Sequence, residues 1–287
     1  MEKTYYCTWG DGTTVTKLAE EILNDPELPN VKSIVIGMWN HEIGDTPPDE
    51  ILEMMVANKE KFQHVESLYV GAMSFEENEI SWIVQGDYED LLNALPNLKS
   101  LKIKGSNELD LGKIDHKNLE KLQIKTGGLP EYVMSSLKSA NLPNLKKLIL
   151  YLGVEDYGYD CKLLDFEALA SKSLFPNLNV LGFVNGEEQD ELVRIILESD
   201  LLPQLKTIRV SCGCLTDKGG QLILDAAAAG KLDNLQKLNA KYHYMSDEMM
   251  EKLKALPFKV KVGDQQEREE GDDDDDDYTG MWPMITE

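Results

Sequence analysis

Hydrophobic and polar residues alternate in one short phrase that returns eight times along this 287-residue chain. The phrase is a Pro-Asn-like lead-in followed by Leu-x-x-Leu-x-Ile/Leu, as at 28–36 and 95–103. Its first apolar positions are Val31, Val65, Leu98, Leu119, Leu145, Leu178, Leu205 and Leu235. Alternation with a period of two over so short a run is typical of a strand with one buried face. Each phrase therefore predicts a β-strand.

The residues between successive phrases carry a helical pattern where the interval is long. Intervals range from 21 to 34 residues. Apolar spacing of three and four predicts helices at 15–23, 129–140, 163–173, 189–199, 216–229 and 246–256. A further helix is expected to open with Thr46 as hydroxyl cap, Pro47 at the first helical position and Asp49 at the third. The shortest interval, 98–119, predicts irregular or 3₁₀ structure.

Strands that alternate with helices predict a parallel sheet covered by helices on one face. A repeat of this length and composition is typical of leucine-rich repeats, which stack because no single unit can bury its apolar stripe alone. We expect one α/β leucine-rich-repeat solenoid, a horseshoe with the sheet on its concave face and helices on its convex face. About eight repeats would fill 1–263, with an N-terminal cap at 1–27, built in part from 5–12, and a last edge strand at 258–262.

Charge and composition narrow the class of protein. The formal net charge is −23, which favours solubility and argues against general attraction to nucleic acid or anionic membranes. No apolar stretch is long enough to span a bilayer, and the N-terminus lacks the basic start and apolar run of a signal peptide. The four cysteines do not form a disulfide or zinc signature, and we interpret them as buried thiols. A cytoplasmic protein is expected.

Several phrases go beyond a generic repeat and carry a family resemblance. They are EISWIVQG at 79–86, GGLP at 127–130, YLG through YG at 151–158, LTDKG at 215–219 and YHYMSDEM at 242–249. Together with the acidic tail, the chain resembles an uncharacterised family of bacterial cytoplasmic leucine-rich-repeat proteins with ribonuclease-inhibitor-like repeats. The resemblance implies a horseshoe and an interaction role, and it supplies no catalytic residues. The end of the tail, 278–284, departs from the family by being bulkier.

Strand alternation also predicts which side chains face out of the concave surface. They lie two, four and six positions after the first apolar residue of each phrase. Eight of these 24 residues are cationic and none is acidic. We expect Lys121 to flank Lys147 and Lys104 to flank Lys125 in neighbouring strands. A one-residue slip of register would reverse the faces.

Aromatic and aliphatic residues beside these lysines suit a protein partner with an acidic or mixed surface. The predicted contact set is Trp39, Tyr69, Lys102, Lys104, Lys121, Gln123, Lys125, Lys147, Ile149, Tyr151, Arg209, Asn239 and Lys241. The alternative interpretation is that lysine is simply a tolerated residue on an exposed strand. Tyr69 and Tyr151 have structural packing as their own alternative.

The last residues of the chain have two interpretations. Residues 264–287 hold eleven acidic residues and one arginine, and 272–277 are six consecutive aspartates. This composition is typical of a disordered, solvated extension. The second hypothesis is an internal ligand: the aspartates bind the basic concave face and Trp282 enters an apolar pocket, helped by the high effective concentration that a short tether gives.

No pattern in the sequence predicts catalysis. We find no phosphate-binding glycine loop, no nucleophile elbow and no metal-ligand spacing among the four histidines. Catalytic, cofactor and metal sites are therefore not expected. The expected function is non-catalytic protein binding. Open alternatives are a eukaryotic-type regulator with repeats and an acidic tail, an accessory subunit of an enzyme or a cryptic enzyme, and a polyanion or RNA binder.

Overall fold

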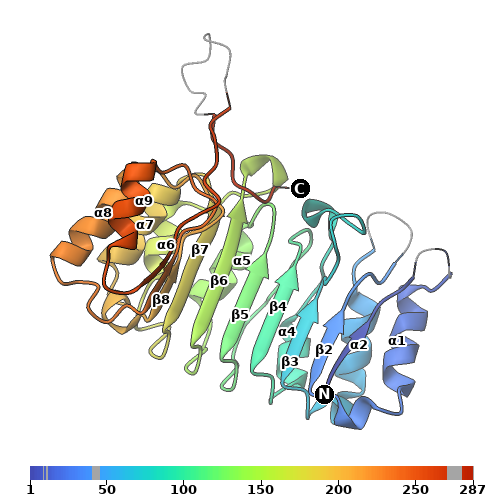
Figure 1. Ribbon diagram of the computed structural model, residues 1–287. Coiled ribbons are helices and arrows are strands. Elements are labelled where there is room, and N and C mark those ends of the chain that lie inside the picture. Colours follow the sequence, from blue (N-terminus) through green and yellow to red (C-terminus); the bar gives the residue numbers. More distant parts are fainter. Residues whose placement is uncertain (9, 11, 41–45, 270–279, 287) are drawn as a thin grey trace.

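The computed structural model describes residues 1–8, 10, 12–40, 46–269 and 280–286. These residues form a ten-stranded sheet in the order β1 to β10, and every neighbouring pair is parallel (Figure 1). The strands are β1 (Glu2–Tyr5), β2 (Ser33–Ile36), β3 (Ser67–Val70), β4 (Ser100–Lys104), β5 (Lys121–Lys125), β6 (Lys147–Gly153), β7 (Val180–Gly186), β8 (Thr207–Arg209), β9 (Lys237–Asn239) and β10 (Lys259–Lys261). The eight repeat strands are where the sequence phrases predict them, and β1 and β10 extend the sheet at its two edges.

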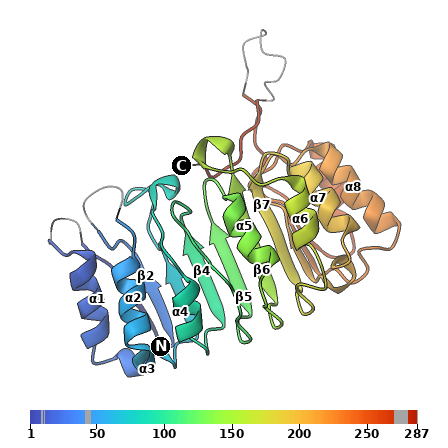
Figure 2. The ribbon, with the colours of Figure 1, turned by 180° about the vertical axis from the view of Figure 1, so that it is seen from behind.

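Helices cover one face of this sheet and leave the other face open (Figure 2). They are α1 (Val15–Asn24), α2 (Asp49–Ala57), α3 (Lys59–Phe62), α4 (Glu89–Ala94), α5 (Glu131–Lys138), α6 (Leu163–Leu169), α7 (Gln189–Glu198), α8 (Asp217–Ala228) and α9 (Asp247–Lys254). Short 3₁₀ turns lie at η1 (Leu28–Asn30), η2 (Ile80–Trp82), η3 (Glu155–Tyr157) and η4 (Leu202–Gln204). The architecture is the predicted α/β leucine-rich-repeat solenoid, with the helices on the convex face.

Hydroxyl side chains cap some of the helices, but not at every predicted position. Thr216 and Ser246 cap α8 and α9 with their hydroxyl groups, at the first residues of the helices predicted at 216–229 and 246–256. The predicted cap at Thr46 is wrong, because α2 starts only at Asp49, with Pro48 at the cap position. Thr46 instead holds the preceding loop: its carbonyl accepts the Trp39 indole N–H (2.9 Å) and its hydroxyl accepts the Asn40 amide (2.8 Å).

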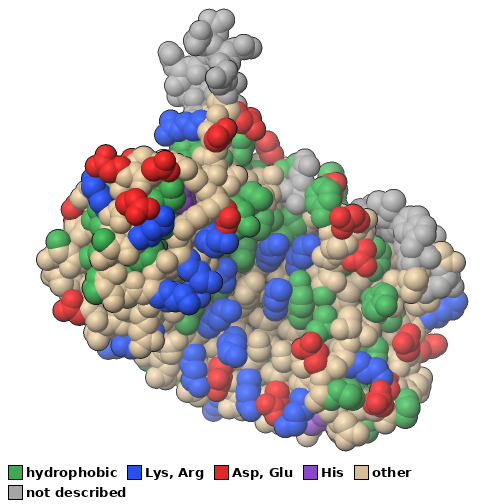
Figure 3. Space-filling view, viewed as in Figure 1, with side chains coloured by type: hydrophobic (Ala, Val, Ile, Leu, Met, Phe, Trp, Pro, Cys, Tyr) green, Lys and Arg blue, Asp and Glu red, His purple; other side chains and the backbone are tan. Residues whose placement is uncertain are grey.

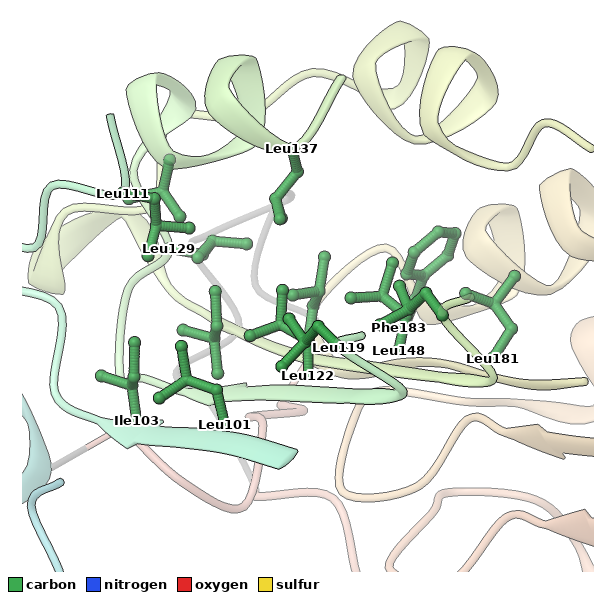
Figure 4. Close-up of a cluster of buried hydrophobic side chains, with 14 of the residues drawn as sticks. Leu101, Ile103, Leu111, Leu119, Leu122, Leu129, Leu137, Leu148, Leu181 and Phe183 are labelled. Carbon is green, nitrogen blue, oxygen red and sulfur yellow. The ribbon is translucent and has the colours of Figure 1, made fainter. Parts of the chain in front are cut away.

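The core is a ladder of aliphatic side chains that runs between the sheet and its outer layer. Leu101, Leu122, Leu148 and Leu181 are partners in successive strands and are buried (Figure 4). Phe183 joins this ladder and meets Phe166 of α6 edge to face, with ring centroids 5.0 Å apart. Burying one such side chain contributes about 1.5 to 3 kcal/mol, and the continuous ladder is what makes the stacked repeats stable together.

The Pro-Asn lead-in of the repeats forms an asparagine ladder along one rim. Each asparagine amide donates a hydrogen bond to a carbonyl in the lead-in or turn of the preceding repeat. The pairs are Asn97 to Gln63, Asn118 to Pro96, Asn144 to Lys117, Asn177 to Pro143 and Asn234 to Pro203, at 2.8 to 3.1 Å. This regular bond explains why asparagine recurs at this position of the lead-in, after proline at Asn97, Asn144 and Asn177. It ties these repeats to the preceding ones at a point where the strands have not yet begun.

Replacing Asn144 with alanine is expected to lower the free energy of unfolding by up to about 1 kcal/mol, because one bond between repeats is lost at an exposed rim. Urea unfolding measures this change. Asn93→Ala is the matched control, since its exposed amide has no hydrogen bond within the described part of the chain. Equal losses in both variants would show that the ladder does not contribute to stability.

Three glycines bring two backbones into contact at the opposite rim, where the strands end. Gly153 has a φ of +78°, and Gly128 and Gly153 form an antiparallel bridge. Val154 N–H donates to the Gly127 carbonyl at 2.8 Å. A Cβ atom at Gly153 would overlap the Gly127 backbone. The sequence GG at 127–128 and the glycine of YLG therefore form one packed junction.

Candidate functional site

The open face of the sheet carries three rows of outward side chains in the predicted register. Ser100, Lys121, Lys147 and Val180 are partners across β4 to β7. The second row runs through Tyr69, Lys102, Gln123, Ile149, Gly182, Arg209 and Asn239. In the third row Lys104 pairs with Lys125, and Tyr151 with Val184. The two predicted lysine pairs, Lys121 beside Lys147 and Lys104 beside Lys125, are therefore confirmed.

Lys and Arg side chains gather over the middle of this face (Figure 3). We call Lys102, Lys104, Lys125, Lys147 and Arg209 the cationic cluster. Within the described residues none of the five forms an ion pair with a carboxylate. Burial lowers the pKa of each of the four lysines, and like charges lower it further for three of them: Lys125 for Lys102 and Lys104, and Arg209 for Lys147. The cluster is thus a concentration of positive charge that an anionic partner would relieve.

Lys104 is the most enclosed member of the cationic cluster. It is 8% exposed, and its ammonium donates to the Met73 carbonyl at 2.7 Å. Burial, followed by the charge of Lys125, lowers the pKa of Lys104 to about 8. Lys104 and Lys125 also line a pocket of about 480 Å³ that is otherwise walled by Met73, Phe75, Ile80 and residues 284–286. Two ammonium groups thus share one partly apolar hollow.

Aromatic rings support the cations from below. The Lys102 ammonium lies 3.8 Å from the ring centroid of Tyr69, and the Lys125 ammonium lies 5.7 Å from that of Tyr151. Arg209 donates to the Tyr151 hydroxyl at 3.5 Å. Cation–π contacts of this kind hold lysine side chains in place without neutralising their charge. Tyr69 and Tyr151 therefore position the cations, in addition to packing on the sheet.

Residues 280–286, which we call the crossing segment, lie along the rim of this face where the strands end (Figure 1). Tyr244 bonds the backbone of Trp282 through its hydroxyl, which accepts from the N–H and donates to the carbonyl, each at 3.0 Å. Met284 N–H donates to the Cys212 carbonyl (2.8 Å), and Ser81 donates to the Thr286 carbonyl (2.5 Å). The segment is therefore bound by three separate repeats.

The centre of the crossing segment is an isoleucine in a socket. Ile285 packs on a cluster of Ile149, Tyr151 and Val184, which we call the apolar socket, and Val180 packs against the same cluster. Asn185 binds the same residue twice: its amide donates to the Ile285 carbonyl (2.5 Å) and its side-chain oxygen accepts from the Ile285 N–H (2.8 Å). Gly127 lies beneath, where a side chain would collide with the Thr286 carbonyl.

Four sequence predictions change in the light of this arrangement. Trp39 is 2% exposed and belongs to the core, because its indole is held by the Thr46 carbonyl, so it is not a residue of the open face. Ile149 and Tyr151, at 0% and 8% exposed, do face outward but are covered by Ile285. Lys241 is ion-paired with Asp264, which raises its pKa.

The tail also differs from its prediction. The prediction that Trp282 occupies an apolar pocket is wrong: Trp282 is 44% exposed, and the residue that packs on the apolar cluster of the face is the half-buried Ile285, three residues later. Residues 264–269 make further bonds, such as Gln266 N–H to the His243 carbonyl at 2.7 Å. The aspartate run at 272–277 lies outside the described residues.

The remaining predicted contacts stay on the face. Gln123 and Asn239 are half-buried and Lys121 is exposed. Near Asn239, three enclosed polar atoms have no hydrogen-bond partner in the described structure: Arg209 Nε, Ser211 Oγ and Asn239 Oδ1. Buried polar groups are normally satisfied, so unsatisfied ones on an open face indicate capacity for a further contact.

Sequence reasoning missed Ile285 and the residues that hold the crossing segment, namely Asn185, Cys212, Ser81 and Tyr244. One signal was available. Ile149, Tyr151, Val180 and Val184 stand together at outward positions of a face otherwise rich in lysine, and a contiguous apolar patch is normally covered. Asn185 adds a second one in the structure: it has a φ of +62°, a left-handed conformation that non-glycine residues adopt rarely and often for a reason.

Two other kinds of feature are absent from the described residues. No three or more of their histidine, cysteine, aspartate and glutamate side chains are arranged to hold a metal ion. None of their helices is both long and apolar enough to cross a membrane.

The fold has a counterpart among solved structures. A Bacteroides fragilis protein with a crystal structure superposes with a TM-score of 0.90 at 44% sequence identity, over 99% of this chain and 77% of that one. This chain belongs to the same family as that Bacteroides fragilis protein. Family membership therefore extends over almost all of the solenoid and its bound segment.

An internalin from Listeria monocytogenes is aligned over 90% of this chain and 71% of that chain, with 14% identity and a TM-score of 0.36. No protein-family model and no curated protein matches the sequence.

Proposed function

We propose that this protein is a non-catalytic protein-binding module that recognises a partner with an acidic or mixed surface through its concave face. The observation that carries the proposal is the cationic cluster, five cations on one concave sheet with no carboxylate partner among the described residues of a chain whose net charge is −23. The acidic residues lie elsewhere, so the concave face is positively charged although the chain as a whole is negatively charged. A concave surface of one sign concentrates its field and steers oppositely charged partners.

The rigid sheet supplies the second requirement for recognition, which is preorganisation. The strands fix the spacing of Lys102, Lys125 and Lys147, and Tyr69 and Tyr151 restrict two of these side chains. Ordering a lysine side chain on binding costs conformational entropy, and that cost is smaller when the side chain is already held. The lysines are expected to raise the association rate, and the aromatic rings beside them to slow dissociation.

We expect the affinity for the partner to fall as the pH rises from 7 to 9. The fall should be several-fold larger than lysines with the usual pKa would cause. A lysine whose pKa is lowered to about 8 loses its positive charge in this interval, whereas one at the usual value near 10.5 keeps it. Lys104→Met retains the aliphatic stem without the charge. Titration of the partner captured from native-host extract, at both pH values, measures the effect.

Lys104→Met should bind at pH 7 about as weakly as the wild type binds at pH 9, and its affinity should change little between the two. A wild-type affinity that stays constant across this range would contradict the contribution of Lys104 to the cationic cluster. Circular dichroism checks that the variant is folded.

A further inference from the structure

The crossing segment is seated on the open face as a peptide ligand would be. It is bound mainly through its backbone, and it packs one half-buried aliphatic side chain, Ile285, against the face. Its contacts come from residues far away in the chain: Asn185 is 100 positions from Ile285, and Ser81 is 205 positions from Thr286. Of the three residues before Ile285, Trp282 and Met284 are exposed and Pro283 is buried.

We propose that Asn185 and the apolar socket form a docking site for an extended segment of the partner, anchored by one branched aliphatic residue, and that the crossing segment occupies it as an internal competitor. This inference rests on the proposed function, because it gives the binding partner a local chemistry. The pocket beside Thr286, lined by Lys104 and Lys125, adds a preference for a carboxylate one or two residues after the anchor.

Asn185 is the specificity element of the site. Its side-chain amide presents one donor and one acceptor to the N–H and carbonyl of the same residue, at 2.5 and 2.8 Å. This pair of hydrogen bonds selects an extended backbone, because a helical residue would have both its N–H and its carbonyl engaged within the helix. The left-handed backbone of Asn185 aims the amide toward the rim, and its own N–H is held by the Ser211 carbonyl at 3.0 Å.

The apolar socket selects the side chain. Ile149 and Val184 are fully buried beneath Ile285, and Tyr151 closes the socket on the side of Lys125. A branched aliphatic side chain fills such a site, whereas a charged one would be buried without a partner. An occupant that left the socket would expose this patch to water, which favours its occupation by the internal segment or by a partner.

The test uses the full-length chain and a fluorescent, amidated peptide with the sequence of residues 280–287. Ile285→Asp should expel the internal segment, because the carboxylate cannot enter the socket. Fluorescence anisotropy then measures peptide affinity. We expect Ile285→Asp to bind the peptide at least tenfold more tightly than the wild type, which has its own competitor. Met284→Asp, with the same new charge on an exposed neighbour, is the matched control and should bind like the wild type.

Two further arms assign the contacts. In the Ile285→Asp background, Asn185→Gly removes the amide and keeps a residue that tolerates positive φ, so loss of binding at least tenfold is expected without loss of fold. A peptide with alanine at the Ile285 position should bind at least tenfold more weakly, and one with alanine at the Met284 position unchanged. Equal peptide binding by wild type and Ile285→Asp, or indifference to the isoleucine, would overturn the inference.

These outcomes separate the inference from the function on which it rests. If the peptide fails to bind while reversal of the concave lysines still abolishes capture of a partner, the docking site is wrong and the proposed function stands. If the peptide binds as expected and partner capture is indifferent to the lysines, the proposed function fails and the docking site stands.

Discussion

Replacing Gly153 with alanine is expected to lower the free energy of unfolding by roughly 3 kcal/mol or more, because two penalties add. Gly153 has a φ of +78°, which alanine adopts only with strain, and its new Cβ would overlap the Gly127 backbone. The junction of Gly127, Gly128 and Gly153 would have to open, and Gly127, which lies against the Thr286 carbonyl, would be displaced with it. Urea unfolding followed by circular dichroism measures the loss.

Gly158→Ala is the control that separates backbone strain from the collision. Gly158 has a φ of +94°, but nothing lies within 4 Å of a Cβ placed there. Its substitution should cost about 1 kcal/mol, the price of the left-handed conformation alone. If Gly153→Ala and Gly158→Ala lost the same small amount, the close approach of the two backbones would not contribute to stability.

Reversing three charges of the cationic cluster at once, Lys102→Glu, Lys125→Glu and Lys147→Glu, is expected to weaken partner binding about 100-fold or more. Facing an acidic surface with carboxylates instead of ammonium groups replaces attraction with repulsion, and such juxtaposition costs several kcal/mol. Lys104 is left unchanged because it is enclosed and bonded to the Met73 carbonyl, so a carboxylate there would test folding instead. Titration calorimetry with the captured partner measures the loss.

The matched variant carries the same charge change elsewhere: Lys61→Glu, Lys113→Glu and Lys231→Glu. These three lysines are exposed, lie outside the concave face and take part in no ion pair among the residues described. Their reversal should change affinity by less than about threefold, mainly through the overall field. Equal losses in the two triple variants would mean that net charge, and not the concave face, governs binding.

Much of the fold could be predicted from the sequence because the repeat gives the same signal eight times. The period-two phrase located every repeat strand and, through the stacking of Leu101, Leu122, Leu148 and Leu181, fixed the register. The register in turn placed the lysine pairs correctly. The predicted start of a helix agrees with the structure at Ser246, whose hydroxyl group is free to cap α9. It is wrong at Thr46, because the carbonyl and hydroxyl groups of Thr46 bond Trp39 and Asn40 instead.

The site could be predicted only in part, because its remaining residues are brought together by tertiary structure. Ile285 is a single aliphatic residue near an acidic run and has no periodic signal. The position of Ile285 depends on Asn185, 100 residues earlier, and on the left-handed backbone conformation of Asn185, for which the sequence contains no signal. Trp282 is the more obvious anchor by size, yet Tyr244 binds its backbone and leaves the ring exposed.

The most direct test of the account is a lysine acetylation footprint of the full-length protein, with and without the partner captured from native-host extract. Binding to the concave face predicts that Lys102, Lys121, Lys125 and Lys147 lose reactivity when the partner is present, while Lys61, Lys113 and Lys231 keep theirs. Protection of the second set, with the concave lysines equally reactive in both samples, would contradict the proposed binding face.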